Sequence, residues 1–65
     1  MKINATKIRA LYTQKGFTQE QFAKKAGLST QGFNAILGRE SCSMGSLLKI
    51  ANALEVLFEE LMYGK

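Results

Sequence analysis

The chain has 65 residues, a formal net charge of +4 and an apolar fraction of 46%, which favour one globular domain over 1–65 rather than a disordered segment. One cysteine cannot form an intrachain disulfide, and the lack of histidine excludes a classical zinc finger. We find neither an apolar run of about 20 residues, as a bilayer span needs, nor the apolar centre of a signal peptide. We therefore expect a cytoplasmic protein without a membrane partner.

The charge is distributed unevenly. Residues 1–39 carry seven Lys or Arg against Glu20 alone, a net +6, whereas residues 40–65 carry a net −2. A basic half indicates a polyanionic partner on that side. A merely solvated basic surface explains the charge equally well.

The first helix is predicted to follow Asn4, which is a good N-cap residue, and to run to about Lys15. Gly16 then supplies a stop signal. The apolar stripe of this helix consists of Ile8, Leu11 and Tyr12.

Two short helices joined by a tight turn are predicted next. Thr18 can cap the first of them, and Gln21 completes a capping box. Gly27 occupies the position at which a helix ends in a left-handed residue. Ser29 can cap the following helix, which is expected to end near Gly38. This spacing of caps, glycine and apolar residues is typical of a helix-turn-helix.

Two further helices complete the prediction. Ser43 is the expected N-cap of a helix that runs to Leu54, with Met44 and Leu48 on its apolar side. A last short helix is expected at about residues 58–62, and no stretch alternates like a strand. The sequence thus predicts an all-α fold of five short helices. The predicted core comprises Ile8, Leu11, Phe22, Ala23, Leu28, Phe33, Ile36, Leu47, Ile50, Ala51, Leu54, Val56 and Leu61.

The stretches TQE at 18–20, AK at 23–24 and GLS at 27–29, followed by Ile36, resemble the lambda-repressor-like, Cro/XRE-type DNA-binding domain. The segment SLLKIANAL at 46–54 is similar to the fourth helix of that family, and Val56 with EEL at 59–61 to its fifth. The resemblance covers roughly residues 5–62. It implies a five-helix fold with a helix-turn-helix at the second and third helices. It also implies sequence-specific binding of double-stranded DNA, as in a small bacterial or phage transcriptional repressor.

If the third helix enters the major groove, its outward side chains read the bases. Glutamine and asparagine can pair with adenine, and threonine and alanine methyl groups suit the thymine methyl, so we expect an A/T-leaning half-site. Alternatively, these are ordinary solvent-facing residues. The expected base-reading residues are Thr30, Gln31, Asn34 and Ala35.

Phosphate contacts are expected from both sides of this helix. By the resemblance, Gln19 contacts the DNA backbone and braces the recognition helix, and the loop after that helix forms a second phosphate clamp. A lysine of the second helix is a weaker candidate, since surface lysines are usually only solubilising. The expected phosphate-binding residues are Gln19, Arg39, Ser41, Ser43 and Lys24.

The C-terminal end carries more apolar side chains than one short helix can bury. We expect Leu57 with Phe58 or Tyr63 to pair with a second copy across a twofold axis, giving a homodimer. Alternatively, these residues fill the underside of the small core. Cys42 is expected to be a buried or half-buried structural thiol.

Several positions depart from the family pattern. Gly32 lies inside the expected reading helix, and Leu37 and Gly38 replace the usual charged residues. Glu55 stands where a glycine is common, and Leu57 where a capping Ser or Thr is common.

An enzyme is not expected, because the chain has no histidine, no paired nucleophile and base and no phosphate-binding loop. Neither a metal, a cofactor nor a small-molecule ligand is indicated. The alternative to a DNA-binding regulator is an antitoxin-like or other protein-interaction module on the same fold.

Overall fold

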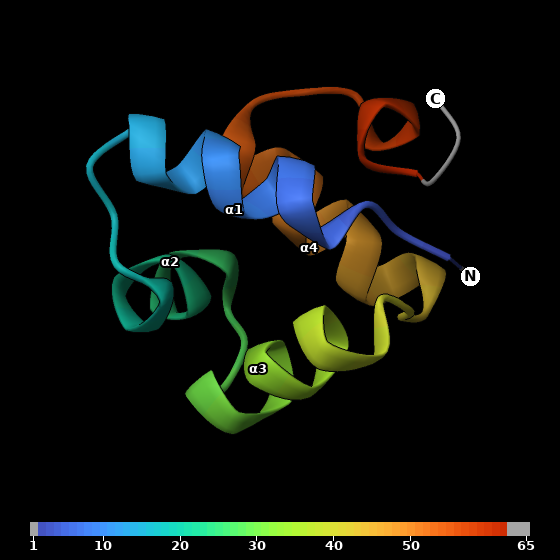
Figure 1. The fold of residues 1–65 in the computed structure, drawn as a ribbon, viewed down its shortest axis with the longest axis horizontal. Helices are drawn as coiled ribbons and strands as arrows, with labels where there is room; N and C mark the ends of the chain where they lie inside the picture. The colour runs from blue at the N-terminus through green and yellow to red at the C-terminus, as the bar shows by residue number, and fades with distance from the viewer. Residues whose placement is uncertain (1, 63–65) are drawn as a thin grey trace.

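The computed structural model describes residues 2–62 and consists of helices joined by short turns (Figure 1). Its elements are α1 (Ala5–Gln14), α2 (Gln19–Ala26), α3 (Thr30–Arg39), α4 (Met44–Leu54) and the 3₁₀ helix η1 (Phe58–Leu61). The all-α prediction is confirmed. The fifth predicted helix is a single 3₁₀ turn rather than an α-helix, so the described residues hold four α-helices. None of these helices is long and apolar enough to cross a membrane.

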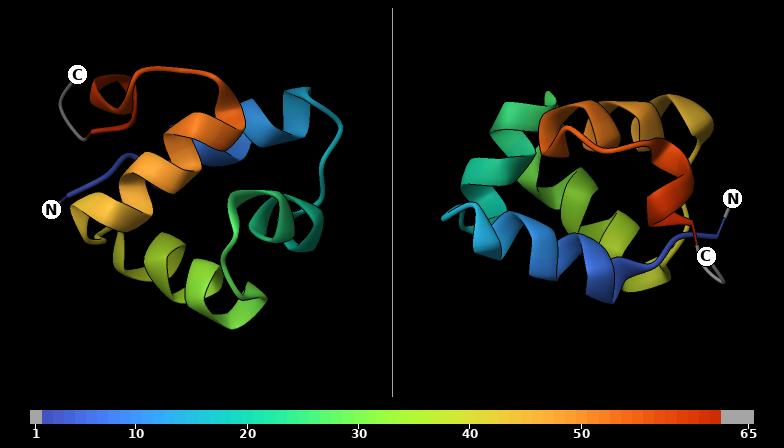
Figure 2. Two further views of the ribbon diagram at one scale, coloured as in Figure 1. Left: turned by 180° about the vertical axis from the view of Figure 1, so that it is seen from behind. Right: turned by 90° about the horizontal axis from the view of Figure 1, so that it is seen from above.

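The helices enclose one hydrophobic cluster. α2 contacts α3 and α4, while η1 contacts α1 and α4. In Figure 1, α3 lies at the edge of the molecule opposite α1, and the left view of Figure 2 shows the same arrangement from behind. The outer side of α3 therefore faces away from the other helices.

The predicted caps explain where the helices begin. The Thr18 hydroxyl accepts a hydrogen bond from the Gln21 backbone N–H at 3.1 Å, and the Gln21 side chain accepts one from the Thr18 N–H at 3.0 Å. The Ser29 hydroxyl accepts from the Gly32 N–H at 2.9 Å. Gly27 ends α2 with φ of 79°, a left-handed conformation. The local chemistry of the helix-turn-helix is thus as predicted from the sequence.

α3 continues to Arg39, one residue beyond the end predicted near Gly38. Leu37 is buried, and this apolar contact favours continuation of the helix past the glycine. The chain turns instead at Glu40, which has φ of 55°. Glu55 ends α4 in the same left-handed conformation, with φ of 61°. This conformation costs a non-glycine residue roughly 1–2 kcal/mol.

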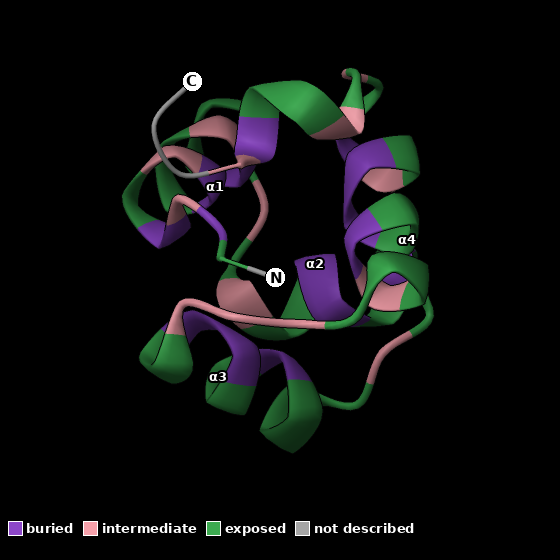
Figure 3. Cartoon of the chain, turned by 90° about the vertical axis from the view of Figure 1, so that its right-hand side faces the viewer, coloured by how far each residue is buried: buried purple, intermediate pink, exposed green. Residues whose placement is uncertain are grey.

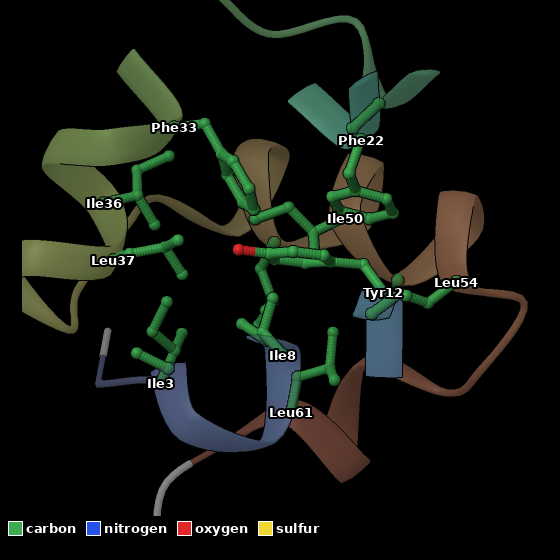
Figure 4. Close-up of a cluster of buried hydrophobic side chains, with 14 of the residues drawn as sticks. Ile3, Ile8, Tyr12, Phe22, Phe33, Ile36, Leu37, Ile50, Leu54 and Leu61 are labelled. Carbon is green, nitrogen blue, oxygen red and sulfur yellow. The ribbon is translucent and has the colours of Figure 1, made fainter. Parts of the chain in front are cut away.

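Aromatic rings form the centre of the core (Figure 4). The rings of Tyr12 and Phe22 stack at a centroid distance of 5.3 Å, and Phe33 lies 5.4 Å from Phe22 and 6.0 Å from Tyr12. Because these rings come from α1, α2 and α3, their contacts fix the helix-turn-helix against α1. The buried apolar residues are Ile3, Ala5, Ile8, Tyr12, Phe22, Ala23, Ala26, Phe33, Ile36, Leu37, Leu47, Ile50, Ala51, Leu54 and Leu61.

The structure corrects the predicted positions of several apolar residues. Met44 and Leu48, which were predicted on the apolar side of α4, are 40% and 42% exposed, because other apolar residues of that helix form the stripe that meets the other helices. Three residues of the predicted core are only partly buried and pack against the cluster: Leu11, Leu28 and Val56.

Ile3 was not predicted in the core, although it is fully buried. It precedes the N-cap Asn4, whose side chain accepts a hydrogen bond from the Lys7 N–H at 3.1 Å. An apolar residue before the cap commonly packs on the fourth residue of the helix, which here is the buried Ile8. This spacing was the signal that could have placed Ile3 in the core.

The segment before α1 joins two distant parts of the chain. The Ile3 N–H donates to the Glu40 carbonyl at 2.9 Å, and the Asn4 N–H donates to the Leu61 carbonyl at 2.7 Å. Antiparallel bridges pair Lys2 with Ser41 and Ile3 with Met62. The N-terminal segment therefore holds the α3–α4 loop and the end of η1 together.

Candidate nucleic-acid interface

One side of α3 is exposed and carries mainly polar side chains. Phe33, Ile36 and Leu37 anchor the opposite side in the core. Figure 3 shows the resulting division of α3 into a buried inner side and an exposed outer side. The exposed residues include all four expected base-reading residues, Thr30, Gln31, Asn34 and Ala35.

A hydrogen bond connects the two helices of the motif across this surface. The Gln19 amide nitrogen donates to the Asn34 side-chain oxygen at 2.9 Å. Gln19 is the first residue of α2 and is half-buried, whereas Asn34 is exposed. An amide oxygen has two lone pairs and the amide nitrogen two donors, so Asn34 keeps both capacities for a base edge. Gln19 thus braces α3, as the resemblance implied, while its phosphate contact stays a prediction.

Gly32 has a structural role within this helix. Its N–H is the donor to the Ser29 cap at 2.9 Å, and a Cβ at this position would lie 2.8 Å from the Ser29 oxygen. A Cβ at this position would require the Ser29 hydroxyl to shift. Glycine avoids this shift, although it lowers helix propensity by about 1 kcal/mol.

The expected phosphate-binding residues lie in two places. Arg39 ends α3 and is exposed, Ser41 is half-buried in the loop, and Ser43 is exposed at the start of α4. The Ser43 hydroxyl already accepts from the Ser46 N–H at 3.3 Å, so it acts as the predicted N-cap. Lys24 is exposed in the last turn of α2, at the opposite end of that helix from Gln19.

The expected dimer residues differ in exposure. Leu57 is 65% exposed, which is more than any other large apolar side chain of the described residues. Phe58 is half-buried and packs against the core cluster, so it fits the alternative in which it fills the underside of the core. Tyr63 lies outside the described residues.

Cys42 lies in the loop before α4 and is half-buried, as expected for a structural thiol. Burial raises the pKa of the Cys42 thiol, so the neutral form is favoured. Within residues 2–62, we find no group of three His, Cys, Asp or Glu side chains that could hold a metal ion.

An open groove lies on another part of the surface, between α4 and the C-terminal end of α2. It is lined by Lys25, Ala26, Lys49, Asn52 and Ala53. Gln19 stands at the other end of α2, so this groove is separate from the expected base-reading surface.

A family model described as a Cro/C1-type helix-turn-helix DNA-binding domain matches residues 7–63. This range includes α2, α3 and α4 completely. Comparison with curated proteins and with solved structures gives no match.

Proposed function

The chain belongs to the Cro/C1-type helix-turn-helix DNA-binding domain family, and we propose that it is a sequence-specific transcriptional repressor of bacterial or phage type. In this proposal residues 1–65 form a single cytoplasmic domain that binds double-stranded DNA as a homodimer. The observation that carries it is the exposed polar side of α3, braced by the Gln19–Asn34 hydrogen bond.

The reading residues act through the edges of the bases. Gln31 and Asn34 have amides that can pair with adenine, and Thr30 and Ala35 offer methyl groups to thymine. Each well-formed amide–adenine pair discriminates by about 1–3 kcal/mol against another base. The Gln19–Asn34 hydrogen bond supports this role, because it restricts the conformations of the Asn34 amide in the unbound protein.

The phosphate contacts set affinity rather than specificity. Arg39, Ser41 and Ser43 belong to one continuous segment that connects α3 to α4. Gln19 lies at the N-terminus of α2, and the N-terminal end of a helix favours an anion. Lys24 adds a positive charge in the last turn of α2, at the opposite end of this helix from Gln19.

The proposed dimer uses the exposed Leu57. Two copies related by a twofold axis would present two α3 helices to the two half-sites of an inverted repeat. Phe58 and Tyr63 are the other proposed contacts. Sedimentation of the protein at tens of micromolar tests this step: a dimer is expected, and a Leu57→Ser variant should sediment as a monomer.

The test of DNA binding is a fluorescence-anisotropy titration of a labelled duplex at several salt concentrations. The wild-type protein should bind with a steep salt dependence, because phosphate contacts release counterions. Arg39→Ala should weaken binding to all sequences alike and lower the slope of log K against log salt by roughly one. A folded wild-type protein that binds no duplex at low salt would refute the proposal and favour a protein-interaction module.

Repression itself needs a separate measurement. The protein should lower expression of a reporter whose promoter overlaps its selected binding site. Variants that lose DNA binding but stay folded should restore expression. Increased expression from the same promoter would refute the repressor assignment without affecting DNA binding.

A further inference from the structure

We propose that the groove between α2 and α4 receives Leu57 of a second copy of this chain. This inference rests on the proposed function, because it names the surface that Leu57 contacts in the homodimer. The groove was not expected from the sequence, since its two walls come from helices that are separated by α3.

Two alanines and two lysines line most of this groove. Ala26 is buried and Ala53 half-buried, so a large apolar side chain can approach the helices closely between them. Lys25 and Lys49 are exposed at the same groove, and the Lys25 ammonium lies 5.6 Å from the centroid of the Phe17 ring. Among residues 2–62, no acidic side chain lines the groove. The groove therefore suits an apolar side chain that has acidic neighbours.

The segment around Leu57 has this composition. Leu57 is 65% exposed, and the exposed Glu55 and Glu59 lie two residues before and after it. The Leu57 N–H donates to a Glu60 carboxylate oxygen at 3.3 Å, and the adjacent Phe58 packs against the core. Because the segment is already ordered in the single chain, association would cost little further backbone entropy. Covering the leucine would also remove apolar surface from water.

The groove and Leu57 are close enough for reciprocal contacts. Ala53 precedes Leu57 by four residues, so their Cα atoms are at most about 14 Å apart. Leu57 does not line the groove of its own chain and stays exposed. In a twofold dimer, a contact between two different residues occurs twice. Each copy would therefore place Leu57 in the groove of its partner, which closes the assembly as a dimer.

The experiment reverses the charges on each side of this contact and measures the dimer dissociation constant by sedimentation equilibrium without DNA. The groove variant is Lys25→Glu/Lys49→Glu, and the acid variant is Glu55→Lys/Glu59→Lys. Each variant alone brings like charges together in both contacts, so it should dimerise at least about tenfold more weakly. An equal mixture of the two should form a heterodimer with an affinity near that of the wild type, because opposite charges then meet in both contacts.

Arg9→Glu/Lys15→Glu is the matched control for the groove variant. Arg9 is exposed on α1, and Lys15 is exposed at its C-cap. Both double variants lower the formal net charge from +4 to zero, so repulsion between copies falls equally. The control should dimerise at least as tightly as the wild type. An equal weakening in the control and in the groove variant would overturn the inference.

The remaining outcomes separate the inference from the proposed function. An unchanged dissociation constant for the folded groove variant, with a dimeric wild type, would overturn only the groove contact. Two weakened variants whose mixture does not recover the dimer would overturn it as well. A wild type that is monomeric at tens of micromolar would overturn both the groove contact and the homodimer, while the anisotropy titration decides DNA binding separately. If a variant is less stable, the mixture is measured at a temperature where circular dichroism shows both variants folded, and recovery of the dimer decides.

Discussion

The Gln19–Asn34 hydrogen bond should couple the two helices of the motif when DNA is bound. The perturbation is a double-mutant cycle with Gln19→Ala, Asn34→Ala and the double variant. The two side chains meet at 2.9 Å, and one such hydrogen bond contributes a net of about 0.5–1.5 kcal/mol. Because Asn34 is exposed, a coupling energy near the lower limit is expected.

This coupling is measured as the non-additivity of the binding free energies for one duplex. A coupling of about 0.5–1.5 kcal/mol means that the double variant binds about two- to tenfold more tightly than the two single losses predict. Asn52→Ala supplies the matched control, because Asn52 is an exposed amide in the α4 groove. Its cycle with Asn34→Ala should be additive. Additive losses for Gln19 and Asn34 as well would refute the idea that Gln19 positions the reading helix.

Three further predictions concern stability and reactivity. Phe33→Ala should lower the free energy of unfolding by about 3–5 kcal/mol. This is a large part of the about 3–10 kcal/mol expected for a chain of this size. An unchanged melting temperature would contradict the central place of Phe33 in the aromatic cluster. Glu55→Gly should stabilise the protein by up to about 1 kcal/mol in urea unfolding, because glycine adopts the left-handed conformation without steric cost; a lower midpoint would contradict this account. Cys42 should react with a thiol reagent at pH 8 more slowly in the folded than in the urea-unfolded protein, since burial raises its pKa; equal rates would argue against burial.

The local features of the fold could be predicted from the sequence because they depend on neighbouring residues. A capping box needs only Thr18 and Gln21, and the left-handed turn needs only Gly27. The exposed side of α3 followed from the spacing of Phe33 and Ile36. These signals were sufficient for the helix-turn-helix and for the exposure of its expected reading residues.

The remaining features depend on contacts between distant residues. The antiparallel bridge pairs Lys2 with Ser41, which lie far apart in the sequence, and no periodic pattern indicates this pairing. Leu37 extends α3 past a glycine because the core has room for its side chain, which only the assembled fold determines. Met44 and Leu48 have helical spacing with the core residues of α4, but they lie beyond the edge of its buried stripe.

The pairing of Gln19 with Asn34 combines both kinds of information. The resemblance implied that Gln19 braces the recognition helix, whereas the identity of its partner required the structure. The crossing of α2 and α3, fixed by their packing, decides which residue of α3 the Gln19 amide can reach. The roles of these residues toward DNA stay predictions.

The most direct test of sequence-specific recognition is selection from a pool of random duplexes at physiological salt, followed by sequencing. We expect enrichment of an A/T-leaning inverted repeat with half-sites about one helical turn apart. Gln31→Ala and Asn34→Ala should each lose preference at particular positions of the half-site. A folded protein that enriches no sequence, or variants that keep the wild-type preference, would contradict the assignment of α3 as the reading helix.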